Sequence, residues 1–200
     1  MMTPNRWHDG RSDADFQKIA HPSFMANFIW LLSLTLAAVA GTVALSCVTP
    51  FAALAVALVA TGGLRAALGL MVAVWLANQV IGFGLFHFPR TPDTFVMGIA
   101  IGAAAVVGTI AAWTVLNRMR AQPVFFRLSA ALVASFAAYE LALIAPVVLL
   151  GDLETFRVAI VAELGLVNAV SLIGMIALNE ILAALCRPWL GRIPWLVRSS

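Results

Sequence analysis

The chain has 200 residues, of which 62% are hydrophobic and 10% are charged, and its mean hydropathy is +0.99. Soluble domains are about a quarter charged, so this composition excludes a soluble globular protein and predicts an all-α, polytopic protein of the lipid bilayer. The net charge of +3 is small and the basic residues are scattered, which excludes a nucleic-acid surface.

The first 49 residues divide into a tail and a span. Residues 1–23 are polar and are expected to form a tail. Residues 24–49 are apolar and longer than the core of a signal peptide, so they predict a retained transmembrane helix. This helix carries small residues at four-residue spacing, a pattern that lets another helix approach closely: Ala37, Ala40, Gly41 and Ala44.

Residues 50–89 carry a single charge, Arg65, and cannot form one straight span. A continuous helix of this length would measure roughly 60 Å, twice the ~30 Å hydrocarbon core. The chain must therefore turn, and Gly62–Gly63 is the only place with turn chemistry next to a charge. We expect a short second helix over residues 51–61 and a third over residues 64–88. In transporters, a short or broken span often marks the binding site.

Three further spans follow, separated by short polar turns. They are expected over residues 95–116, 124–150 and 156–186. Residues 187–200 contain tryptophans and arginines, which is typical of an interfacial tail. The chain thus divides into a tail (1–23), a six-helix membrane domain (24–186) and a C-terminal tail (187–200).

The distribution of Lys and Arg orients the six spans. With a cytoplasmic N-terminus, the outer segments hold only Arg90 and Arg157, and the inner segments hold the other ten of the 12 basic residues: Arg6, Arg11, Lys18, Arg65, Arg118, Arg120, Arg127, Arg187, Arg192 and Arg198. This is a strong positive-inside bias, and a five-span arrangement would place the basic C-terminus outside. This bias predicts that both termini lie in the cytoplasm. We expect a multi-pass protein of the bacterial inner membrane.

Polar side chains within the apolar spans predict the functional site, because a charge at the bilayer centre costs roughly 3 kcal/mol even on lenient scales. Counted from the outer ends, several of them fall about 10–18 Å deep. We therefore predict an outward-facing pocket that also has aromatic walls and a histidine at its rim. The predicted pocket residues are Asn78, Gln79, Glu140, Asn168, Glu163, Tyr139, Trp75 and His87.

Two other interpretations of these polar residues stay open. In the first, they form hydrogen bonds with one another across helices and only fix the packing. In the second, the chain is an intramembrane enzyme, although Glu140, Glu163 and His87 form no recognisable catalytic order. Asn179 and Glu180 fall near the inner surface, where we expect a topological role.

Enzymatic and metal chemistry find little support in the sequence. His87 has no neighbouring His or Cys at ligand spacing, and a lone interfacial histidine does not make a metal site. The chain has no phosphate-binding glycine loop, no nucleophile elbow and no zinc-protease motif. We predict no catalytic residues, no metal and no cofactor.

The small-residue first helix, the short helix after Pro50 and the run LGLMVAVWLANQVIGF (residues 68–83) resemble the membrane S components of energy-coupling factor transporters, the biotin type most of all. The resemblance implies a six-helix protein that binds a vitamin or cofactor precursor from its outer side. It also implies that an alanine patch on the first helix, matched here by Ala40 and Ala44, docks a transmembrane T component coupled to ATPases.

We therefore expect a membrane protein for vitamin uptake that binds a small-molecule solute and performs no covalent chemistry. The rival hypothesis is a structural or assembly subunit of a membrane complex. In that case the small-residue faces bind partner helices and the carboxylates make buried hydrogen bonds.

Overall fold

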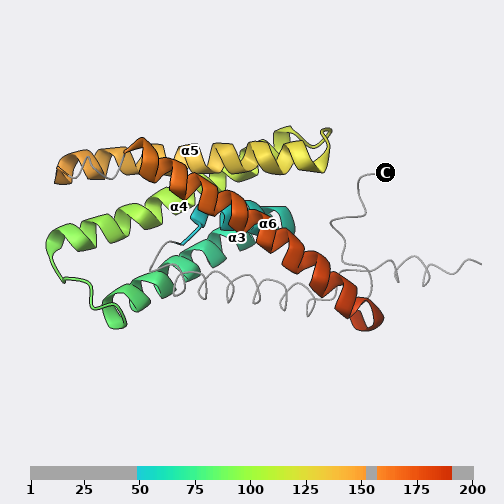
Figure 1. The fold of residues 1–200 in the computed structure, drawn as a ribbon, viewed down its shortest axis with the longest axis horizontal. Helices are drawn as coiled ribbons and strands as arrows, with labels where there is room; N and C mark the ends of the chain where they lie inside the picture. Colours follow the sequence, from blue (N-terminus) through green and yellow to red (C-terminus); the bar gives the residue numbers. More distant parts are fainter. Residues whose placement is uncertain (1–48, 152–156, 191–200) are drawn as a thin grey trace, which may run out of the picture.

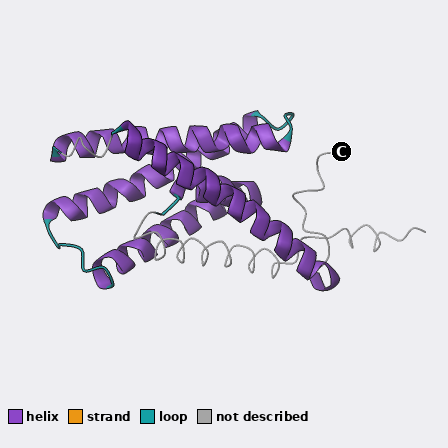
Figure 2. Ribbon diagram, viewed as in Figure 1, coloured by secondary structure: helices purple, strands orange, loops and turns teal. Residues whose placement is uncertain are grey.

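The computed structural model describes residues 49–151 and 157–190, and all regular structure within them is helical (Figure 2). Within these ranges, four helices are long and apolar enough to cross a membrane. They are α3 (Phe51–Gly84), α4 (Pro92–Arg118), α5 (Val124–Leu150) and α6 (Val158–Leu190). The first predicted span up to residue 48, with the proposed docking residues Ala37, Ala40, Gly41 and Ala44, lies outside the described residues, as does residue 191 onward.

The predicted turn within residues 50–89 is confirmed. Gly63 has φ 72° and ψ 175°, which interrupts α3 between two helical segments. This backbone conformation is almost restricted to glycine, because a Cβ atom would collide with the local backbone. The interruption divides α3 into a short segment, residues 51–62, and a long segment, residues 64–84.

The long segment ends earlier than predicted, at Gly84 instead of residue 88. The chain leaves the helix because His87 adopts a left-handed conformation with φ 54°. The amide of Phe88 then turns back to donate to the carbonyl of Gly82 at 3.1 Å. The Phe88 ring lies over Gly82, where any added Cβ would come within 2.9 Å of it.

The other helix ends follow from local capping chemistry. α4 starts at Pro92, before the predicted residue 95, because the Thr91 hydroxyl accepts from the amide of Thr94 and proline suits the first helical position. α5 has the predicted bounds. α6 starts at Val158 and continues to Leu190, beyond the predicted end at residue 186.

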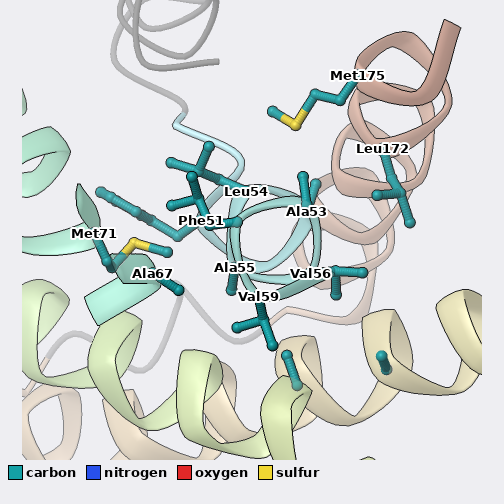
Figure 3. Close-up of a cluster of buried hydrophobic side chains, with 14 of the residues drawn as sticks. Phe51, Ala53, Leu54, Ala55, Val56, Val59, Ala67, Met71, Leu172 and Met175 are labelled. Carbon is teal, nitrogen blue, oxygen red and sulfur yellow. The ribbon is translucent and has the colours of Figure 1, made fainter. Parts of the chain in front are cut away.

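The short segment of α3 is the centre of the packing. Every residue from 51 to 59 is buried, so this part of the segment turns no side to lipid or water. Leu172 and Met175 of α6 lie against one side, and Ala67 and Met71 of the long segment belong to the same cluster (Figure 3). A helix that is apolar all round is suited to such a position.

The remaining helices surround this centre. α4 packs along both α3 and α5, whereas α6 contacts mainly α3 and crosses the others at a steep angle (Figure 1). Many large apolar side chains stay exposed on the outside of the helices, among them Val80, Phe125, Val133, Leu149, Val158 and Ile173. An apolar surface of this extent is unfavourable in water and suits contact with lipid tails.

Candidate functional site

The N-terminus of the short segment is held by an asparagine from a distant helix. The first amides of a helix have no partner within it, and Pro50 has no side chain that could accept from them. Asn168 of α6 takes this role: its Oδ1 accepts from the amide of Ala53 at 3.0 Å. Its Nδ2 donates to the carbonyl of Leu164 at 2.9 Å, which fixes the orientation of the side chain. Asn168 is 6% exposed and fully engaged.

Asn78, on the long segment, contacts the chain at the same N-terminus of the short segment. Its Oδ1 accepts from the hydroxyl of Thr49 at 3.1 Å, just before the short segment begins. The backbone turns tightly there, because the amide of Phe51 donates to the carbonyl of Thr49 at 2.8 Å. A side chain from α6 and another from the long segment therefore meet the same helix end.

Tyr139 of α5 completes the group. Its ring stacks on the ring of Phe51, with centroids 6.0 Å apart and planes inclined by 28°. Asn78, Asn168 and Tyr139 therefore come together from three helices around residues 49–53. Such a helix N-terminus carries a partial positive charge and suits an anionic or hydrogen-bond-accepting group.

Trp75 and Gln79 do not join this group but lie between α3 and α4. The indole Nε1 of Trp75 donates to the carbonyl of Gly98 at 2.8 Å, and the ring covers Gly102. A Cβ atom at Gly102 would lie 2.6 Å from Trp75 Cε2, and one at Gly98 would lie 2.7 Å from Gln79 Oε1. The two glycines make room for these two side chains, which fix the packing of the helix pair.

The two predicted carboxylates and the histidine occupy three different places. Glu140 is partly buried, and its Oε1 finds no hydrogen-bond partner in the part of the chain that the structure describes. It lies one turn beyond Phe136, whose ring is close to Gly165, so it belongs to the flank of α5 that faces α6. Glu163 is exposed on α6, and His87 is exposed in the connection between α3 and α4.

Asn179, for which the sequence predicts a topological role near the inner membrane surface, is buried within the protein. It is 1% exposed, whereas its neighbour Glu180 is exposed. Spacing would have revealed this: 11 residues separate Asn168 from Asn179, so both lie on one face of α6. Within the described ranges, no three potential metal-ligating side chains lie together.

Comparisons of the chain with models of protein families, with curated proteins and with solved structures find no match.

Proposed function

We propose that this chain is a solute-uptake protein of the bacterial inner membrane, similar to an S component, that binds a vitamin or cofactor precursor at the N-terminus of the short segment. The observation that carries the proposal is the broken helix α3: its short segment is buried on all sides, and its N-terminus meets Asn78, Asn168 and Tyr139. Discontinuous helices with polar side chains at their buried ends form the substrate sites of many transporters.

The proposed topology places this helix end near the middle of the bilayer. Six helices with both termini in the cytoplasm put Gly63 and Arg65 at the inner surface, together with most other basic residues. A 12-residue segment rises about 18 Å from there, just over half of the hydrocarbon core. The bound solute would enter from the outer side.

The chemistry of the helix end favours one class of solute. The amides at the start of the short segment and the hydroxyl of Thr49 are donors, which suit a carboxylate. The stacked rings of Phe51 and Tyr139 suit an apolar or ring-containing body. A vitamin or precursor with both parts fits, and Glu140 on the neighbouring flank would contact a polar group further out. Binding would exchange the contacts of Asn78 and Asn168 for contacts with the solute, and release would follow from rocking of the surrounding helices.

The energising partner is also a proposal. A T component with its ATPases would dock on the small residues of the first predicted span, which include Ala40 and Ala44. Transport itself then needs no covalent step within this chain.

A thermal-shift series tests solute binding in the detergent-purified protein. The panel contains vitamins with a carboxylate, namely biotin, nicotinate, pantothenate and lipoate, and the methyl ester of each. A ligand at 100 times its Kd adds about 2.7 kcal/mol to the free energy of unfolding. We expect one acid, and not its ester, to raise the thermal midpoint.

Variants test whether a solute that raises the thermal midpoint binds at the proposed site. Asn78→Ala and Glu140→Ala should lose the shift while remaining folded, and Asn117→Ala should keep it, since Asn117 bonds Arg120 at the far end of α4. A shift that survives in both Asn78→Ala and Glu140→Ala would place the solute elsewhere and contradict the proposed site.

The second candidate function is a structural or assembly subunit of a membrane complex. One observation favours it: Asn168 and Asn78 are both bonded to the protein itself, and Trp75 and Gln79 pack against glycines. No shift with any member of the panel, together with co-purification of other membrane proteins, would support this function over solute uptake.

A further inference from the structure

Four arginines lie at one end of the helices, where the long segment of α3 begins, α4 ends and α5 begins. They are Arg65, Arg118, Arg120 and Arg127. The connection between α4 and α5 spans only residues 119–123, so three of the four share one end of that helix pair (Figure 1). Ala67 and Leu116 belong to the same buried cluster, which brings the start of the long segment, with Arg65, to this end as well.

Arg127 carries a charge in a partly buried position. Its Nε is covered by the protein and has no hydrogen-bond partner within the described residues. Arg127 begins a row at four-residue spacing that continues with Ala131 and Ser135, both 0% exposed. Ser135 lies against Gly108 of α4, so this row forms the α4 side of α5. Counted from that contact along two antiparallel helices, Arg127 and Arg118 come to nearly the same level.

No carboxylate in the described part of the chain forms an ion pair with these arginines. Three of the described carboxylates lie further along the helices or at their other end: Asp93, Glu140 and Glu163. Glu180 is exposed on α6 and pairs with none of the four. Arg120 donates from its Nη2 to Asn117 Oδ1 at 2.6 Å, which is a neutral partner. Among the described residues this positive charge therefore has no neutralising partner, and an anion from outside the chain is favourable here.

Two exposed aromatic rings stand beside Arg127. Phe125 and Phe126, in the first turn of α5, are 73% and 60% exposed, and their rings meet edge to face with centroids 5.7 Å apart. Exposed rings beside cations at the end of a membrane helix suit the boundary between headgroups and acyl chains. A soluble anion leaves these rings uncovered, whereas a phospholipid offers a phosphate for the guanidinium groups and acyl chains for the rings.

We propose that this end of the α4–α5 pair binds one anionic phospholipid. Its phosphate accepts hydrogen bonds from the guanidinium groups of Arg118 and Arg127, and an acyl chain lies over the two exposed rings. Arg65 and Arg120 add positive charge around the headgroup, which favours an anionic lipid over a zwitterionic one. In the proposed topology this end lies at the cytoplasmic surface. The lipid site shares no residue with the proposed solute site, so either proposal can fail without the other.

Native mass spectrometry of the detergent-purified full chain measures the binding, with phosphatidylglycerol and phosphatidylcholine of identical acyl chains as probes. We expect phosphatidylglycerol to bind at least about fivefold more tightly, since each arginine near an anionic headgroup contributes a factor of about five. The double variant Arg118→Gln/Arg127→Gln should weaken phosphatidylglycerol binding at least about tenfold. Arg118→Lys/Arg127→Lys keeps both charges and should retain most of the affinity. Arg90→Gln, an equal loss of charge in the connection between α3 and α4, should bind as the unmodified protein does.

Glycerol 3-phosphate distinguishes a lipid from a free phosphate, because it carries the phosphate without acyl chains. A large excess of it should not displace phosphatidylglycerol, and Phe125→Ser/Phe126→Ser should weaken lipid binding at least about threefold. Thermal midpoints show that each variant is folded. Equal binding of the two lipids by the unmodified protein would overturn the proposal without any variant. Full affinity in a folded Arg118→Gln/Arg127→Gln variant, an equal loss in Arg90→Gln, or displacement by glycerol 3-phosphate would also overturn it.

Discussion

Replacing Asn168 by leucine is expected to lower the free energy of unfolding by at least about 2 kcal/mol. The change removes the acceptor for the amide of Ala53, which is buried at the start of the short segment. Pro50 cannot substitute as a cap, so the orphaned amide has no ready alternative in the protein. The midpoint of unfolding in mixed SDS and neutral detergent measures the loss.

Asn179→Leu is the matched control, because it makes the same change on the same face of α6. Among the described residues Asn179 has no hydrogen-bond partner to lose, and a leucine there would meet the apolar side chains of Leu172, Met175 and Ile176. We expect the free energy of unfolding to stay the same or rise by about 1 kcal/mol. If both variants lost stability equally, the capping role assigned to Asn168 would be wrong.

Leu54→Ala is expected to lower the free energy of unfolding by about 2–4 kcal/mol, because it opens a cavity at the centre of the molecule. Leu54 is 0% exposed and belongs to the central cluster of buried apolar side chains (Figure 3). Lipid cannot fill a void at this position, so the lost van der Waals contacts are not replaced.

The control for this variant is Leu76→Ala, in the long segment of the same helix. Leu76 is 50% exposed, and lipid or detergent can occupy the space that its side chain leaves. Leu76→Ala should lower the free energy of unfolding by less than about 1 kcal/mol. Similar losses for the two variants, measured by the same detergent unfolding, would argue against a central position of the short segment.

The turn at Gly63 and the bounds of α5 could be predicted from sequence, because both depend on local rules. The length of residues 50–89 exceeds one bilayer crossing, and only Gly62–Gly63 offers turn chemistry. α5 begins after Pro123 and ends before Gly151, whose φ is 75°. The end of the long segment was missed, because it depends on the ring of Phe88 covering Gly82.

It is harder to predict which side of each helix faces the protein interior and which faces lipid. Apolar residues surround all of these helices, so periodicity does not separate the inner side from the lipid side. For this reason Glu163 and Asn168, which lie on one helix, received the same prediction, although only Asn168 is buried. The depth of Asn179 near the inner membrane surface does not show that its side chain is buried. Its spacing from Asn168 was the available signal.

The central claim is that the N-terminus of the short segment is reached from the outer side of the membrane. Thiol labelling of Asn78→Cys tests it directly, in a background with Cys47→Ala and Cys186→Ala and with a membrane-impermeant maleimide. We expect labelling in right-side-out vesicles and not in inverted ones, and protection by any solute found in the thermal-shift series. Ser135→Cys, buried between α4 and α5 near Gly108, should resist labelling in both. If Asn78→Cys reacted no faster than Ser135→Cys, or reacted only in inverted vesicles, an outward-facing site at this helix end would be contradicted.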